Sequence, residues 1–214
     1  MPRHTFSFPK EVRDIVREYV DSRVFSIDAE RFNQEPKYVS ALLSKLEGVV
    51  YEGNSGFIKF EVTDIDDRGP NSAESIYGAD FAITAEISDG IKRIRKAIFC
   101  QAKLGAIEEM DTTALDFLKD QIEKMKRHTR SPKVLEIDEY RGVRFPSIIS
   151  GNQVLEDSIN TSTSLSNYIV RRVLTTLDGD TRKSFVDAVQ HSSLPKLNVL
   201  AVTNLITQES LNEE

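Results

Sequence analysis

The chain has 214 residues and a formal net charge of −6, because 34 Asp or Glu outnumber 28 Lys or Arg. With 39% hydrophobic and 29% charged residues, the composition excludes a membrane protein and a chain that is disordered along its whole length. The net acidity argues against a protein that coats nucleic acid nonspecifically, but it leaves room for an enzyme with a local basic rim.

Cysteine content and the N-terminal sequence give a first expectation about location. Cys100 is the only cysteine, so a disulfide framework and a four-cysteine zinc site within one chain are excluded. Residues 1–20 hold no apolar run typical of a signal peptide, and no stretch of about 18 apolar residues suggests a membrane span. We expect one domain with extensions, located in the cytoplasm and not associated with a membrane.

The N-terminal third begins with two predicted helices and a strand. Apolar residues recur every three or four positions over residues 10–20 and again over 36–47. Pro36 is tolerated in a first helical turn, and Gly48 is typical of a helix end. Alternating apolar and polar residues then predict a strand over 57–65.

The middle of the chain predicts a β-hairpin followed by a helix. Two strands, over residues 79–87 and 97–104, are separated by Ser88-Asp89-Gly90, which has the composition of a turn. Helical spacing returns over residues 112–128, and Ser131-Pro132 ends it.

The C-terminal part mixes short strands and helices. Strands are predicted over residues 134–137, 143–145 and 199–202, and helices over residues 165–177 and 181–190. No internal repeat or long linker separates two domains. The sequence therefore predicts an α/β (α+β) domain with a mixed central sheet flanked by helices.

Polar residues in the predicted hairpin are the candidates for chemistry. Because successive side chains of a strand alternate faces, Gln101 and Lys103 lie on one face, with Cys100 and Ala102 on the other. If the pair is antiparallel, Asp80 at the start of the first strand lies across from them. Mg²⁺ takes oxygen ligands of this kind, and a lysine beside a metal-bound water helps to generate or orient hydroxide.

These motifs, Gly78-Ala79-Asp80 and Gln101-Ala102-Lys103, resemble those of the PD-(D/E)XK nuclease superfamily, which has the restriction-endonuclease-like fold. Its core of a helix, a three-stranded sheet, a helix and a further strand is similar to the predicted order over residues 35–137. The resemblance divides the chain into an N-terminal helical extension (1–34), a nuclease core (35–137) and a largely helical C-terminal extension of the same domain (138–214). Gln101 stands where a carboxylate is usual, as in the Q-x-K branch.

The resemblance implies a Mg²⁺- or Mn²⁺-dependent endonuclease that hydrolyses DNA, of the kind found in bacterial restriction and anti-phage defence. The metal would be held by Asp80, one glutamate, the Gln101 side-chain oxygen and the Ala102 carbonyl. Lys103 would position or deprotonate water. Three glutamates compete for the second acid: Glu35 before the first core helix, Glu47 at its end and Glu74 before Asp80, with Glu74 and Glu35 preferred over Glu47.

A basic cluster in the hairpin turn is a candidate for phosphate contacts. Its residues are predicted to lie beside the site, where each contact would add salt-dependent affinity without sequence information; they are Lys92, Arg93, Arg95 and Lys96. The same residues can equally be solvated side chains of a turn.

Two alternatives stay open at this point. In the first, Asp80 is a turn residue, Gln101 a hydrogen-bonded amide and Lys103 a lysine at a sheet edge. In the second, the chain is a catalytically silent interaction or adaptor module on a nuclease-like scaffold, because a fold does not fix a function. A homodimer, which double-strand cleavage would need, and a regulatory partner protein are likewise options that the sequence leaves open.

Overall fold

The computed structural model describes residues 6–28, 31–63, 73–140 and 142–203. The helices are α1 (Lys10–Phe25), α2 (Glu35–Leu46), α3 (Ala73–Tyr77), α4 (Thr112–Lys126), α5 (Gly151–Leu155), α6 (Leu165–Tyr168) and α7 (Lys183–His191). The strands are β1 (Gly48–Gly53), β2 (Gly56–Thr63), β3 (Phe81–Ser88), β4 (Arg93–Leu104), β5 (Lys133–Tyr140), β6 (Val143–Ser150), β7 (Thr163–Ser164) and β8 (Lys196–Thr203). A 3₁₀ turn spans Ile107–Glu109, and a π-helical turn spans Ile169–Val173.

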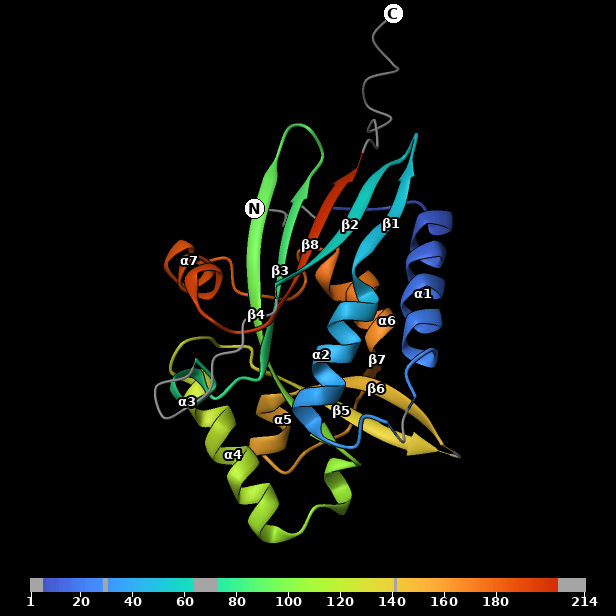
Figure 1. Ribbon diagram of the computed structural model, residues 1–214. Coiled ribbons are helices and arrows are strands. Elements are labelled where there is room, and N and C mark those ends of the chain that lie inside the picture. The colour runs from blue at the N-terminus through green and yellow to red at the C-terminus, as the bar shows by residue number, and fades with distance from the viewer. Residues whose placement is uncertain (1–5, 29–30, 64–72, 141, 204–214) are drawn as a thin grey trace, which may run out of the picture.

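The strands form one eight-stranded mixed sheet with the order β1-β2-β8-β3-β4-β5-β6-β7 (Figure 1). Strand β3 pairs antiparallel with β4 and parallel with β8, and β4 pairs parallel with β5. The parallel step from β4 to β5 needs a crossover, which α4 provides. Figure 1 shows β4 running along the length of the sheet, with the β3–β4 turn at one end and α4 beyond the other.

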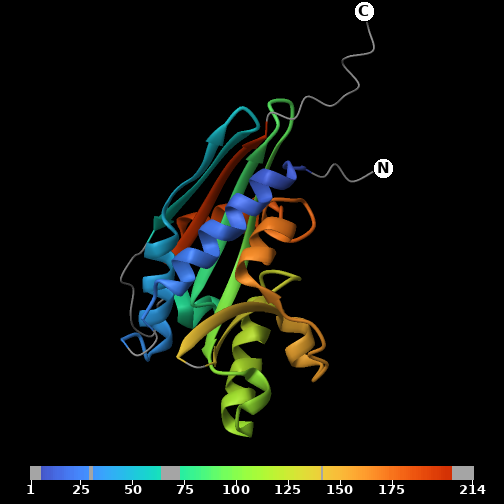
Figure 2. The same ribbon diagram turned by 90° about the vertical axis from the view of Figure 1, so that its right-hand side faces the viewer.

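Helices cover both faces of this sheet, so the domain has three layers. One buried apolar cluster joins the sheet to α1, α2, α6 and the π-helical turn, and a second joins it to α3, α4, α5 and α7. Figure 2 shows α1 crossing in front of the strands beside α6. Helix α1 follows its sequence pattern, since Val12, Val16, Val20 and Val24 recur every fourth residue and are buried.

The expected mixed α/β architecture is confirmed, and several element bounds are corrected. The sequence did not predict three short elements, because segments of five or six residues are too short to display a period; these are strand β1 and helices α3 and α5. The helix expected over 165–177 is instead α6 followed by the π-helical turn. Among the described residues, no helix is both long enough and apolar enough to cross a bilayer.

Strand β8 gives the sheet a topology that the local patterns do not indicate. It lies between β2 and β3, antiparallel to the first and parallel to the second. The three strands that the nuclease resemblance implies, β2, β3 and β4, are therefore not contiguous. The C-terminal segment contributes a central strand of the sheet, and the β3–β4 hairpin gains a second buried neighbour from it.

Candidate active site

The β3–β4 register brings Asp80 opposite Gln101. Phe81 pairs with Cys100, and the Asp80 amide donates to the Cys100 carbonyl at 2.9 Å, so the ladder continues one residue beyond β3. The Asp80 carboxylate then accepts a hydrogen bond from the Ala102 amide at 2.7 Å and another from the Gln101 side-chain amide. The predicted meeting of these residues across the hairpin is confirmed.

Gln101 is held in an unusual polar environment for a central strand. Its residue surface is 1% exposed, and its Nε2 group donates both to Asp80 and, at 3.3 Å, to the Ala102 carbonyl. Its Oε1 atom is buried and has no hydrogen-bond partner among the described residues. One amide therefore occupies the point where two oxygens converge, while its own oxygen is unsatisfied, which costs free energy in a buried position.

Lys103 is paired with Glu35 at the end of β4. The Lys103 ammonium lies 3.1 Å from Glu35 Oε2, and the Leu104 backbone amide donates to Glu35 Oε1 at 3.3 Å. Glu35 is the first residue of α2, and Pro36 suits the first turn of that helix. The N-terminus of α2 therefore lies against the end of β4. The Lys103 side chain is only 10% exposed, and the Glu35 side chain 30% exposed.

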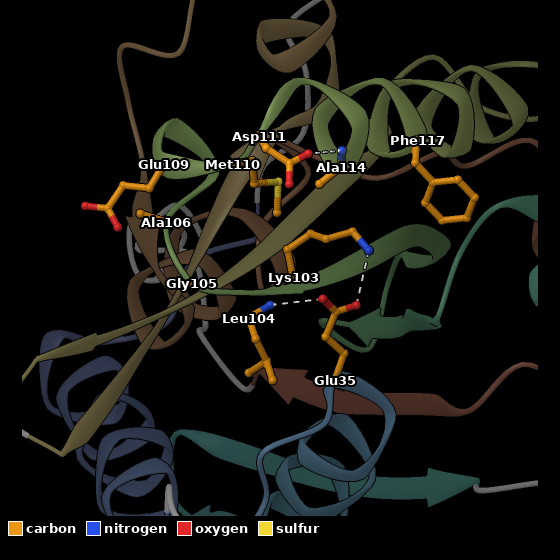
Figure 3. A pocket seen from close by; sticks show the side chains of 10 residues that line it. All are labelled: Glu35, Lys103, Leu104, Gly105, Ala106, Glu109, Met110, Asp111, Ala114 and Phe117. Carbon is orange, nitrogen blue, oxygen red and sulfur yellow. Dashed lines mark hydrogen bonds and ion pairs between the residues drawn. The ribbon is translucent and has the colours of Figure 1, made fainter.

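A pocket of about 460 Å³ opens beside this ion pair. Figure 3 shows Lys103 and Glu35 on one side, the start of α4 on another, Met110 nearer the base of the lysine side chain and Phe117 toward its amine end. The Lys103 ammonium lies 6.0 Å from the centre of the Phe117 ring. Asp111, which also lines the pocket, caps α4 by accepting a hydrogen bond from the Ala114 amide at 2.8 Å.

The three candidate glutamates differ in where the structure puts them. Glu35 contacts Lys103, whereas Glu47 follows the other end of α2, about 18 Å away along a helix of 12 residues. The Glu47 carboxylate lies 3.5 Å from the Val62 amide. Glu74 belongs to α3, but its side chain lies outside the described residues, so its predicted role stays a prediction.

The basic cluster does not lie beside the site, and that expectation was wrong. Ten residues of extended β4 separate Arg93 from Lys103, which is about 33 Å. Figure 1 shows the β3–β4 turn at the opposite end of the strand from α4. Two arginines of the cluster, Arg93 and Arg95, are also paired with Glu86, whereas Lys92 is exposed.

Lys96 is not a surface residue, so its predicted phosphate contact is also corrected. It is 1% exposed, and its ammonium donates to the backbone carbonyls of Arg172, Thr175 and Asp178. Burial lowers the pKa of Lys96 to about 7, although the nearby Asp178 carboxylate acts in the opposite direction. The lysine therefore anchors the segment that follows the π-helical turn.

The donor set around Asp80 suits a hard divalent cation. No group of three His, Cys, Asp or Glu side chains that could hold a metal occurs among the described residues. The oxygens that converge are instead one Asp80 carboxylate oxygen, the Ala102 carbonyl and, if its amide group turns over, Gln101 Oε1. With a cation bound, that turn would give the orphaned oxygen a partner, and carboxylate and carbonyl oxygens are the ligands that Mg²⁺ and Mn²⁺ take.

Phe117 is the site residue that the sequence interpretation missed. The apolar spacing of α4 rests on buried residues such as Leu118, Ile122 and Met125, and Phe117 lies outside that stripe. A large aromatic residue off the buried stripe was the available signal.

No protein-family model, curated protein or solved structure matches this chain.

Proposed function

We propose that the protein is a metal-dependent nuclease that hydrolyses phosphodiester bonds of DNA, built on a restriction-endonuclease-like core. One observation carries the proposal: two residues apart on the same face of β4, Gln101 meets Asp80 and Lys103 meets Glu35, and the second pair lines an accessible pocket. Buried polar groups cost free energy unless they are hydrogen-bonded or paired. Lys103 and the Gln101 amide nitrogen are paired, but Gln101 Oε1 has no partner among the described residues, and a bound cation would supply one.

Each residue has a chemical role in this proposal. Asp80, the Gln101 side-chain oxygen and the Ala102 carbonyl would hold Mg²⁺ or Mn²⁺. When bound, such a cation polarises a phosphate oxygen and lowers the pKa of water. Lys103 would orient the attacking water and offset the negative charge that grows on the phosphate. Glu35 would hold the Lys103 ammonium in place, and its ion pair with Lys103 supports it as the second acid of the proposed site.

The charges of the site are consistent with this chemistry. Two carboxylates, Asp80 and Glu35, and one ammonium, Lys103, carry one net negative charge. A divalent cation would reverse that sign, and a phosphodiester would then bring the total back to neutral. The net negative charge favours binding of the cation first, and the bound cation then favours the phosphodiester.

The direct test is cleavage of plasmid and single-stranded DNA with Mg²⁺, with Mn²⁺ or with EDTA. Wild type would be compared with Asp80→Ala and Lys103→Ala, and with Asp120→Ala and Lys183→Ala as matched controls on exposed helix positions. We expect cation-dependent cutting that both site variants lose, by at least a hundredfold, and that both controls keep.

Cutting that survives Asp80→Ala and Lys103→Ala would contradict the proposal. Absence of cutting in folded wild-type protein would instead favour the interaction or adaptor module. In that case a partner interaction that Asp80→Ala retains would be the corresponding sign. A place in bacterial defence or restriction is part of the proposal, resting on the likeness of the Gln101-Ala102-Lys103 motif to that branch of nucleases.

A further inference from the structure

Phe117 is an exposed aromatic residue at the edge of the pocket that holds Lys103. Its residue surface is 60% exposed, and it projects from α4 beside the buried Leu118. Single exposed apolar residues are common on protein surfaces and need no explanation by themselves. Phe117, however, lines the same pocket as the Lys103–Glu35 pair, with its ring centre 6.0 Å from the ammonium.

The charge of the pocket argues against a grip on duplex DNA. Three carboxylates line it, from Glu35, Glu109 and Asp111, and Lys103 is the one basic residue among the described residues that line it. Duplex binding depends on several lysines or arginines that neutralise phosphates on both strands. The basic β3–β4 turn lies about 33 Å along β4 from the site, too far to serve the scissile phosphate.

An unpaired base meets different requirements, and the pocket satisfies them. Stacking on an aromatic ring carries no net charge, so the acidic rim does not oppose it. A volume of about 460 Å³ lies in the range of small-molecule sites and suits a single nucleotide rather than a helix. Figure 3 shows Phe117 toward the amine end of Lys103 and Met110 nearer the base of its side chain, so both apolar residues lie by the lysine.

We infer that Phe117 is a stacking residue and that the substrate presents an unpaired base next to the scissile phosphate. The inference rests on the proposed nuclease function and names its substrate class, single-stranded DNA. A base and its own phosphate are joined by one sugar. A base on the Phe117 ring therefore delivers that phosphate to Lys103 without needing a basic surface around the pocket.

Binding in EDTA tests the inference without any cleavage. A short single-stranded oligonucleotide that carries 2-aminopurine, and the same strand annealed to its complement, would be titrated with the full chain. Stacking quenches 2-aminopurine fluorescence. We expect the single strand to bind more tightly than the duplex, and Phe117→Ala to weaken its binding roughly 5- to 150-fold, the usual range for one base on one ring.

Two further variants separate stacking from loss of fold. Phe117→Tyr keeps a ring and should retain wild-type binding. Phe25→Ala removes a residue that is 58% exposed on α1, on the other face of the sheet, and should have no effect. Equal binding of duplex and single strand, or wild-type binding by Phe117→Ala, would overturn the inference.

The outcome also separates this inference from the proposed function. If Phe117→Ala loses single-strand binding but the wild type cuts nothing with Mg²⁺ or Mn²⁺, the stacking site stands and the nuclease proposal fails. If the wild type cuts and Phe117→Ala binds and cuts normally, the nuclease stands and the stacking site fails.

Discussion

The side-chain amide of Gln101 donates to the carboxylate of Asp80 across the end of the β3–β4 hairpin. The same amide donates to the Ala102 carbonyl, so its nitrogen lies between two oxygens that a cation would bridge. When no cation is present, Gln101 therefore satisfies these two oxygens by donating hydrogen bonds to them. A glutamate at this position would lack that ability, which gives a physical reason for an amide here.

Replacing Gln101 with Glu tests this role of the amide. Without a divalent cation, Gln101→Glu would set two carboxylates against each other in a buried position, and we expect the free energy of unfolding to fall by about 1–3 kcal/mol. Added Mn²⁺ should raise the melting temperature of the variant more than that of the wild type. Thermal unfolding with EDTA and with Mn²⁺ measures both effects.

Gln190→Glu makes the same chemical change on the exposed side of α7, where the new carboxylate would face Arg95, which already donates to Gln190 Oε1, instead of another carboxylate. It should therefore not lower stability, and it should not add a dependence on Mn²⁺. A Gln101→Glu protein that is as stable as the wild type in EDTA, and whose melting temperature does not change with Mn²⁺, would show that no cation binds between Asp80 and residue 101.

The Glu35–Lys103 pair should stabilise the fold modestly, in addition to any role in catalysis. Its partners are separated by 68 residues in sequence and fix the start of α2 to the end of β4. A double-mutant cycle with Glu35→Gln and Lys103→Met, followed by denaturant unfolding, should give a coupling energy of about 1 kcal/mol. Additive losses in the double variant would mean that the two side chains do not stabilise each other.

The site could be predicted from the sequence where it depends on local periods. Strand alternation placed Gln101 and Lys103 on the face opposite Cys100 and Ala102, and the turn at residues 88–90 implied a hairpin. Both expectations are confirmed, because Cys100 and Ala102 lie in one buried cluster and the ladder pairs Phe81 with Cys100. A period of two and a turn composition are properties of a few consecutive residues, and a sequence displays them directly.

The parts that could not be predicted depend on residues far apart in the chain. Strand β8 enters the sheet between β2 and β3, and no local pattern in either neighbour indicates that partner. Lys96 belongs to a run of charged residues that is typical of a surface. Its burial follows from carbonyls of a segment 76 or more residues later, which only the folded chain brings to it.

Gly78 should be sensitive to substitution, because it sets the approach to Asp80. Its φ is +71°, and an added Cβ would lie 2.4 Å from the Gln121 carbonyl oxygen and 2.9 Å from Lys124 Cβ. We expect Gly78→Ala to lower the free energy of unfolding by about 1–3 kcal/mol through backbone strain and the forced separation of this loop from α4. Denaturant unfolding measures the loss.

Gly90→Ala separates the two causes. Gly90 has a similar φ of +85° at the hairpin turn, but an added Cβ there would meet nothing within 4 Å. Its substitution therefore reports the backbone cost alone. The close approach of Gly78 to α4 would be refuted by equal losses in the two variants.

Lys96 should make stability depend on pH above neutrality. Burial lowers its folded-state pKa to about 7 from an ordinary value of 10.5, so between these values the unfolded chain holds a proton that the folded chain has released. The free energy of unfolding should therefore gain from this residue as pH rises from about 7 to about 10, and below pH 7 the residue should add no slope. Lys96→Met removes the titrating group and should flatten the profile relative to wild type. Lys183→Met, on an exposed position, should leave the wild-type slope intact, and parallel profiles for wild type and Lys96→Met would show that Lys96 keeps its proton in the fold.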